Sequence, residues 1–288
     1  MRRRSTRLVS PAVDALRQIE SWPCDHAAVG VAAAGEVVAE HGDVEYRFGW
    51  GSVTKLLTAY ATLVAAEEGA IDLDEPVGPE GSTVRHLLAH ASGLAWDSPQ
   101  PLAKPGERRI YSNTGYLILA AHVEARTEIP FATYLDEAVL SPLGLDATLE
   151  GDAAGGMVGS LRDMLRFGRE ALAATLIAPE TLAEATAVQF PGLDGVLPGF
   201  GRQSPNDWGL GFELRDAKSP HWTGSLNSPR TYGHFGSKPG TATFLWIDPE
   251  RQLVGAALAD VSFGAWAIEA WPALSDAILS EGTRAATR

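Results

Sequence analysis

The sequence predicts an α+β fold: an antiparallel β-sheet flanked by N- and C-terminal helices, with an inserted, mostly helical subdomain. Three observations lead to this prediction. Short apolar segments typical of strands occur near both ends of the 288-residue chain, over 27–38 and again after residue 208. Between about residues 80 and 185, apolar residues instead recur at helical spacing. A turn at Asp248–Arg251 joins the last two strands as a hairpin.

The N-terminal elements are predicted from local patterns. Residues 11–21 carry a weak helical pattern, and Ala27–Val38 contains two Ala- and Val-rich strands joined at Gly35-Glu36. Thr54–Glu68 has apolar residues at positions 56, 57, 60, 63 and 64, which is the spacing of one helix face. Gly69 follows this helix and marks its end.

The middle of the chain is predicted to be helical, and strands return after Trp208. Four helical segments alternate with polar loops: Val84–Ala91, Thr114–Arg126, Phe131–Val139 and Leu161–Ala174. The later strands are expected over Gly209–Leu214, Thr241–Ile247 and Leu253–Ala259. A last helix is expected over roughly 264–280.

This order of elements predicts a single catalytic domain over residues 1–288. Both chain ends would build its sheet subdomain, over about 11–75 and 205–285, and about 76–204 would form the helical subdomain. A cleft is expected where the two parts meet, which is a common place for a ligand pocket. The Gly- and Pro-rich stretch Gln189–Asn206 is expected to border it.

Charge and composition exclude several classes of protein. The chain has 23 Lys plus Arg against 36 Asp plus Glu, a formal charge of −13, so it lacks the basic footprint for nucleic acid or an anionic membrane. Its single cysteine, Cys24, excludes an intrachain disulfide. Met1–Arg7 is basic, but the apolar run after it is short and interrupted by Pro11 and Asp14. We therefore expect a cytoplasmic protein in which these arginines form a solvated tail.

Ser52-Val53-Thr54-Lys55 is the first candidate catalytic motif. Its two polar ends are three residues apart at the start of a helix, so Ser52 and Lys55 can meet on one face. A serine hydroxyl becomes an effective nucleophile when a neighbour takes its proton, and a lysine can do so if burial keeps part of it neutral. About one chance Ser-x-x-Lys is expected in a chain of this size, so the motif alone is weak.

Two further motifs strengthen this interpretation. Tyr111-Ser112-Asn113 lies in a loop before a helix, where Tyr111 can relay a proton and Asn113 can hold Lys55 or bind a substrate carbonyl or amide. Alone it is more simply a loop tyrosine with a helix cap. The third motif runs from Gly233 to Gly240, and its glycines leave the backbone open to a ligand. A backbone N–H there can complete an oxyanion hole with that of Ser52.

Together, the three motifs resemble those of the serine β-lactamase and penicillin-binding-protein superfamily. Tyr-x-Asn is similar to the class C branch, and His234-x-Gly236 to its esterase, D-aminopeptidase and acyltransferase relatives. The resemblance extends over about residues 46–260 and includes the stretch from His86 to Leu94 and the segment Trp208–Phe212.

The resemblance implies a role for each motif residue. Ser52 would be the acylated nucleophile, Lys55 its general base, and Tyr111 a proton shuttle that also activates the deacylating water or alcohol. The residues that would bind substrate are Asn113, His234, Gly236 and Ser237. The backbone N–H groups of Ser52 and Ser237 would form the oxyanion hole.

The third motif departs from that of the β-lactamases. It has His234 where they have Lys, and Phe235 where they have Thr or Ser. A largely neutral imidazole and a phenyl ring are poor partners for a substrate carboxylate, and a lost charge-assisted contact costs about 1.5–3 kcal/mol. Lys238 offers a positive charge nearby, but a register that assigns it to the motif spoils the match to His-x-Gly-x-x-Pro-Gly. We therefore expect an esterase that acts on small uncharged esters or amides.

Three alternatives stay open at this stage. The same acyl-enzyme can be captured by an alcohol or amine, which would make the protein an acyltransferase. A β-lactamase or D-Ala peptidase activity is disfavoured by His234-Phe235. A binding protein without catalysis would be expected to have lost Ser52, Lys55 or Tyr111, and all three are present. The sequence leaves the oligomeric state undetermined.

The remaining histidines and the cysteine are interpreted as structural, and no metal or cofactor is expected. His86 and His90 have the i, i+4 spacing of zinc ligands, but the sequence offers no Glu between them and no third ligand. His122 and His221 are expected at surface or capping positions, and Cys24 is expected to be a buried or edge thiol.

Overall fold

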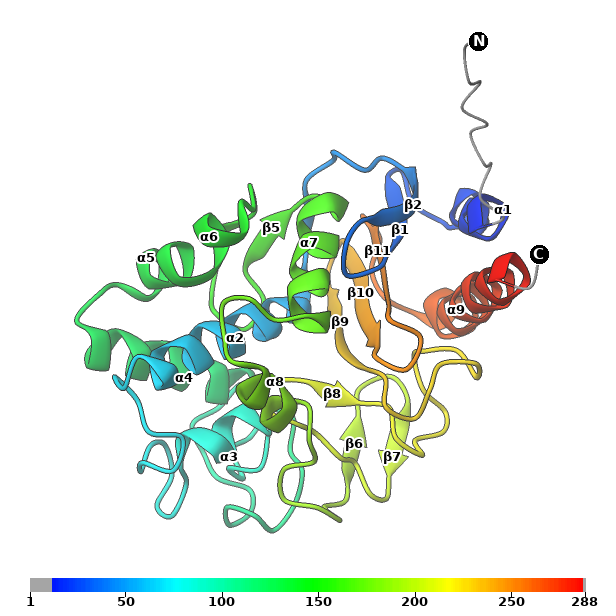
Figure 1. Cartoon of the computed structure of the whole chain (residues 1–288). Coiled ribbons are helices and arrows are strands. Elements are labelled where there is room, and N and C mark those ends of the chain that lie inside the picture. Colours follow the sequence, from blue (N-terminus) through cyan, green and yellow to red (C-terminus); the bar gives the residue numbers. More distant parts are fainter. Residues whose placement is uncertain (1–11, 287–288) are drawn as a thin grey trace.

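Both ends of the chain meet in one antiparallel sheet. The structure is a computed structural model that describes residues 12–286. The strands of its main sheet are β1 (Ala27–Ala32), β2 (Val37–Gly42), β8 (Glu213–Leu214), β9 (Tyr232–Lys238), β10 (Thr241–Asp248) and β11 (Leu253–Ala259). They lie in the order β2-β1-β11-β10-β9-β8, and each neighbouring pair is antiparallel (Figure 1). The predicted α+β fold with an antiparallel sheet is confirmed.

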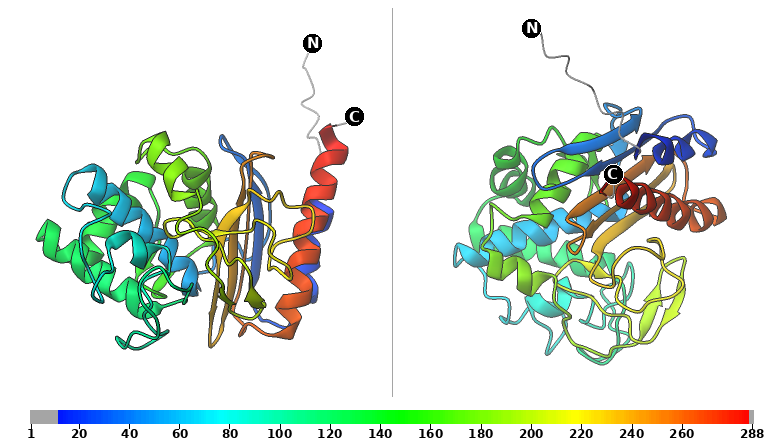
Figure 2. Two further views of the ribbon diagram at one scale, coloured as in Figure 1. Left: turned by 90° about the horizontal axis from the view of Figure 1, so that it is seen from below. Right: turned by 45° about the vertical axis from the view of Figure 1, so that its right-hand side comes forward.

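Helices cover both faces of this sheet. The terminal helices α1 (Ala12–Leu16) and α9 (Ala265–Ala286) lie side by side on one face, and α7 (Leu161–Leu172) lies on the other (Figure 2). Alternation along β10 explains the two layers, because Phe244 and Trp246 join the apolar cluster under α9 while Leu245 joins the cluster under α7. The strands β1, β10 and β11 are therefore buried on both faces, whereas the edge strand β2 is largely exposed.

The other helices form a body beside the sheet (Figure 1). They are α2 (Thr54–Glu67), α3 (Val84–Leu88), α4 (Asn113–Thr127), α5 (Phe131–Leu135), α6 (Ser141–Leu143) and α8 (Pro179–Ala185), with a 3₁₀ turn at Gly51–Val53 and a π-helical turn at Asp136–Leu140. A further 3₁₀ turn, Arg17–Ser21, follows α1. Short strands complete the fold: β3 (Phe48–Gly49), β4 (Thr148–Leu149) and β5 (Met157–Gly159) form one sheet, and β6 (Gly195–Leu197) pairs with β7 (Gly201–Gln203).

The predicted strand Gly209–Leu214 is wrong over most of its length, because only Glu213 and Leu214 form a strand. The residues before them form a tight turn, in which the Gly209 N–H donates to the Phe212 carbonyl at 2.8 Å. Gly211 has a φ of +89°, a left-handed conformation that does not occur in a strand. The apolar residues of this segment therefore pack as a turn.

Strand β9 is a second difference, since its residues were predicted only as a glycine-rich approach to the next strand. Glycines at 233 and 236 weaken its strand propensity. It is nevertheless a strand because β8 and β10 pair with it from both sides. A third difference is a shorter helix: the helix predicted over Val84–Ala91 ends at Leu88.

The basic segment Met1–Arg7, predicted to be a solvated tail, lies outside the described residues. Within residues 12–286, no helix combines the length and apolar character that crossing a bilayer requires.

The packing of α7 on the sheet predicts that Gly168→Ala destabilises the protein. A Cβ at Gly168 would lie 2.5 Å from Val254 Cγ1 and 2.9 Å from Leu245 Cδ1. Ala has a higher helix propensity than Gly by about 1 kcal/mol, but overpacking a core costs about 1–3 kcal/mol. We expect a net loss of about 1 kcal/mol in the free energy of unfolding, measured by urea denaturation.

Gly35→Ala is the matched control, because nothing lies within 4 Å of a Cβ at Gly35 and its backbone is not left-handed. We expect its stability to equal or slightly exceed that of the wild type. A Gly168→Ala protein more stable than the wild type would contradict this account of the α7 interface.

Candidate active site

Ser52 lies in the 3₁₀ turn Gly51–Val53, immediately before α2. This turn rests directly on strand β9. A Cβ on Gly236 would lie 2.1 Å from the Trp50 carbonyl oxygen, and a Cβ on Gly51 would lie 3.1 Å from the Ser237 nitrogen. Glycine at both positions therefore permits the close approach that puts Ser52 and Ser237 on the wall of the same cavity.

Lys55 lies in the first turn of α2 and is completely buried. Its Nζ donates to Asn113 Oδ1 and to the Ala154 carbonyl, both at 2.7 Å, and lies 3.3 Å from Ser52 Oγ. Burial lowers the pKa of Lys55 to about 7, although the nearby carboxylates of Asp152 and Asp97 oppose this effect. A substantial fraction of neutral amine is therefore present at neutral pH.

The geometry around Lys55 suits a general base. In the neutral amine, the two short bonds to Asn113 and Ala154 use both N–H groups. The nitrogen lone pair is then free to accept the proton of Ser52 Oγ, which is the remaining neighbour.

Asn113 is the first residue of α4, and its side chain connects Lys55 to Asp97. Asn113 Nδ2 donates to Asp97 Oδ1 at 2.7 Å, which sets the orientation of the amide. The amide oxygen therefore points at Lys55. The sequence motifs included Asn113 but offered no signal for Asp97, which lies in a separate loop.

Tyr111 lies beside both Lys55 and the third motif. Lys55 Nζ is 4.9 Å from the centre of its ring, and the Tyr111 hydroxyl is 3.4 Å from His234 Nε2. Burial raises the pKa of the Tyr111 phenol, and a hydrogen bond with the Ser52 side chain opposes this effect. Tyr111 is therefore a protonated phenol near neutral pH, placed to pass a proton between neighbours.

His234 is a neutral hydrogen-bond acceptor at this site. Its Nδ1 lies 2.6 Å from the Phe235 carbonyl oxygen, which can only accept, so Nδ1 carries the proton and Nε2 accepts from Tyr111. Burial lowers the pKa of His234 to about 3, and the nearby Lys55 charge adds to this. His234 therefore does not replace the lysine cation of the β-lactamase motif. Lys238 is exposed at the end of β9 and donates to the Gly155 carbonyl at 3.3 Å.

A cavity of about 360 Å³ opens beside Ser52. Its lining is mostly aromatic and apolar and comprises Ser52, Trp96, Tyr111, Leu197, Pro198, Gly199, Trp208, Glu213, His234, Phe235, Ser237 and Phe263. The loop predicted to border the cleft contributes Leu197, Pro198 and Gly199. This lining contains a carboxylate but neither Lys nor Arg.

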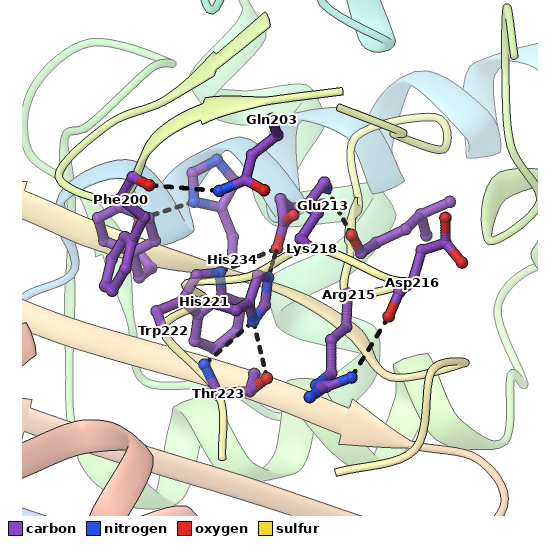
Figure 3. Close-up of polar contacts among 12 residues, drawn as sticks. Phe200, Gln203, Glu213, Arg215, Asp216, Lys218, His221, Trp222, Thr223 and His234 are labelled. Carbon is purple, nitrogen blue, oxygen red and sulfur yellow. Dashed lines mark hydrogen bonds and ion pairs between the residues drawn. The ribbon is translucent and has the colours of Figure 1, made fainter. Parts of the chain in front are cut away.

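The carboxylate, Glu213, is held in a buried polar cluster (Figure 3). It pairs with Lys218 and accepts from His221 Nε2 at 2.8 Å and Trp222 Nε1 at 2.9 Å. Burial raises the pKa of the Glu213 carboxyl, but Lys218 and His221 overcome this and hold the pKa at about 2. Lys218 also donates to the carbonyls of Asp207 and Leu214, so all three of its N–H groups are occupied. The cluster therefore stabilises the cavity wall, and Glu213, held by these partners, does not serve as a second general base.

The cluster corrects one expectation, because His221 is buried rather than at the surface. Its Nδ1 accepts a hydrogen bond from the Thr223 N–H, so Nε2 is the protonated nitrogen and donates a hydrogen bond to Glu213. The sequence places His221 and Glu213 eight residues apart in an irregular segment, and no periodicity connects them.

The other histidines also have protein partners. His86 Nδ1 lies 2.9 Å from Thr83 Oγ1, and His122 Nε2 lies 2.5 Å from Glu75 Oε1. His90 follows the end of α3 with a φ of +54°, accepts the Ser112 N–H and packs against the Tyr111 ring at 4.5 Å. Among the described residues, no group of three or more His, Cys, Asp or Glu side chains is arranged to hold a metal ion.

The structure thus brings all seven predicted site residues to one location, from the start of α2, the start of α4 and strand β9. Sequence reasoning did not identify Asp97 or Glu213 as site residues. It also assigned no site role to Trp96, which lines the cavity and packs edge-on against Tyr111.

Comparison with known proteins identifies the relatives of this arrangement. The family model described as Beta-lactamase matches residues 24–273. A crystal structure of a β-lactamase from Mycobacterium bovis is 50% identical, covers 93% of this chain and 98% of its own, and superposes with a TM-score of 0.90.

Curated relatives are more distant. Penicillin-binding protein 4* of Bacillus subtilis is 25% identical over 39% of this chain and 36% of its own length. A putative D-alanyl-D-alanine carboxypeptidase of Salmonella heidelberg is 28% identical over 52% of this chain and 44% of its own length. The chain thus aligns with less than half the length of these two relatives.

The lowered pKa of Lys55 predicts the pH dependence of acylation. If neutral Lys55 takes the Ser52 proton, kcat/KM for a neutral ester rises about tenfold per pH unit below pH 7 and levels off above it. Asp152 raises the pKa of Lys55, so Asp152→Asn is expected to move the rising limb to lower pH. Stopped-flow acylation between pH 5 and 9 measures both. A rate that still rises tenfold per pH unit up to pH 9 would show that Lys55 remains protonated at neutral pH.

The buried cluster predicts a large effect of Glu213→Gln on stability. The substitution leaves Lys218 buried without its counter-charge, which typically costs about 3–5 kcal/mol. Arg17→Gln is the control, because the Arg17–Glu20 pair is 60% and 50% exposed and is worth at most about 1 kcal/mol. Urea denaturation of both variants at pH 7 checks the difference; equal effects would mean that the cluster does not support the fold.

Proposed function

The chain belongs to the β-lactamase family of the serine β-lactamase and penicillin-binding-protein superfamily, and from this premise we propose that it is an esterase-like serine hydrolase. It forms an acyl-enzyme at Ser52 and acts on uncharged esters or amides. Lys55 serves as general base, and Tyr111 as proton shuttle. Asn113, His234, Gly236 and Ser237 belong to the substrate site.

The charge of the cavity carries the choice of substrate. The lining beside Ser52 has no Lys or Arg, and its one ionised side chain is the carboxylate of Glu213. His234 is neutral because burial lowers its pKa to about 3. A substrate carboxylate would therefore lose its hydration without gaining a cation, whereas a neutral acyl group can pack against Trp208 and Phe263.

The proposed acylation conserves protons within the site. Ser52 Oγ attacks the substrate carbonyl carbon as its proton passes to Lys55 Nζ. The backbone N–H groups of Ser52 and Ser237 stabilise the oxyanion. As the C–O or C–N bond breaks, Tyr111 gives its proton to the leaving atom and recovers one from Lys55. Water then enters by the reverse relay and releases the acid.

A second candidate is hydrolysis of β-lactams or D-Ala peptides. The names of the relatives favour it, since the 50% identical structure is described as a β-lactamase and a curated relative as a putative D-alanyl-D-alanine carboxypeptidase. The absence of a cation in the lining of this cavity argues against it. Acyl transfer to an alcohol or amine would use the same acyl-enzyme and differ only in the acceptor.

Intact-protein mass spectrometry separates these functions. Wild-type protein and Ser52→Ala are incubated with p-nitrophenyl acetate, p-nitrophenyl butyrate, a fluorophosphonate and a penicillin. We expect p-nitrophenol release and a fluorophosphonate adduct for the wild type only, with Ser52→Ala still folded. Lys55→Ala and Tyr111→Phe are expected to lower turnover by orders of magnitude, because the residues act as a unit.

The penicillin sample tests the second candidate. A lasting penicillin adduct with no ester turnover would move the assignment to a penicillin-binding protein. An adduct with none of the reagents would favour a protein without catalytic activity.

A further inference from the structure

A second hollow, of about 760 Å³, adjoins the catalytic cavity. Both are lined by Trp96, Tyr111 and Pro198, so these three side chains form their common boundary. Strand β6 and the loop before it supply part of the lining of this hollow, and β6 lies in the lower part of Figure 1. The hollow is about twice as large as the cavity beside Ser52.

Exposed apolar side chains gather in this hollow. Trp96, Leu102 and Val196 are 50%, 56% and 60% exposed, which makes them the three most exposed large hydrophobic side chains among the described residues. A ligand that covers apolar side chains removes them from water, which lowers the free energy of the system. Their convergence beside the catalytic cavity therefore indicates a site for an apolar group.

The charged residues of the hollow are engaged with protein groups. Arg202 pairs with Asp194 at 2.8 Å, and the buried Arg109 donates to the carbonyls of Asn206, Ala89, Gln189 and Phe190. Arg108 donates to the Leu102 carbonyl at 3.1 Å. The hollow also contains the carboxylates of Glu107 and Asp194, which largely offset the charge of its three arginines. Its exposed apolar side chains are therefore the main surface that it offers, and this surface suits an uncharged ligand.

Tyr111 identifies which part of a substrate enters the hollow. In the proposed function, on which this inference rests, Tyr111 protonates the leaving atom, so the leaving group lies next to its hydroxyl. The acyl group occupies the enclosed cavity against Trp208 and Phe263. Because Tyr111 stands at the boundary, the leaving group continues past it into the larger hollow.

We propose that this hollow is a leaving-group subsite that binds an uncharged, apolar alcohol or amine, with Trp96, Leu102 and Val196 as its specificity-determining side chains. The preferred substrate then combines a compact acyl group with a larger apolar leaving group. In acyl transfer, an alcohol acceptor would use the same subsite, because it enters by the reverse of the leaving step.

A series of 4-alkylphenyl acetates tests the proposal. Methyl, ethyl, propyl and butyl members share the acetyl group and differ little in the acidity of the phenol, so kcat/KM reports contacts of the alkyl chain. Full burial of one methylene is worth about fourfold, and we expect about a tenfold rise from methyl to butyl in this partly open hollow. The double variant Leu102→Ser/Val196→Ser is expected to remove most of this rise.

The slope along the series, rather than the absolute rate, is the readout. Fluorophosphonate labelling of the double variant reports whether Ser52 remains competent. Val188→Ser is the matched control, since Val188 is also exposed, at 40%, but lines neither the hollow nor the catalytic cavity. It is expected to keep the wild-type slope. A wild type without a slope, or a double variant that retains it, would overturn the proposal.

A binding measurement tests the subsite even if the double variant does not hydrolyse any of the esters. Calorimetric titration of 4-butylphenol into Ser52→Ala is expected to detect binding. Adding Leu102→Ser/Val196→Ser should weaken it by about tenfold, and unchanged affinity would contradict the subsite. If wild-type protein neither turns over any ester nor reacts with the fluorophosphonate, the proposed function fails and the subsite assignment fails with it. Ester turnover with no alkyl dependence overturns the subsite alone.

Discussion

Burial of the Lys55 amine is the constraint on which the proposed chemistry depends. Burial lowers the pKa of Lys55 from 10.5 to about 7 against the opposing effect of two nearby carboxylates, so the site as a whole disfavours the charged form by about 5 kcal/mol. Two short hydrogen bonds, to Asn113 and the Ala154 carbonyl, compensate the neutral amine. Their partners come from α4 and from the segment before β5, so helix packing around α2 determines the basicity of one nitrogen.

The close approach of β9 to the turn that carries Ser52 is the second constraint. Gly236 faces the Trp50 carbonyl, and Thr243 on β10 donates to that same oxygen at 2.8 Å. This contact joins the central sheet to the start of α2 and aligns His234 and Ser237 with Ser52. The site therefore depends on the sheet for one wall and on the helical body for the other.

The fold was largely predictable where apolar periodicity and turn residues agreed. β11 was predicted with its observed bounds, and the helix of α2 to within one residue. Predictions failed where tertiary pairing overrode local preference: β9 is a strand despite two glycines, and Gly209–Phe212 is a turn despite its apolar residues. The sequence patterns did not identify Asp97 or Glu213 as site residues, because folding rather than spacing along the chain brings these residues to their partners.

The sequence by itself determined the motifs, their order and the local proximity of Ser52 and Lys55, because two residues that are three positions apart at the start of a helix lie on the same face. It also determined the loss of the third-motif lysine. Only the tertiary structure decided that Lys55 is largely desolvated, that His234 is a neutral acceptor, and that an apolar hollow continues from the cavity past Tyr111. Desolvation and cavity shape depend on atoms brought together from distant segments, and a one-dimensional pattern does not carry that information.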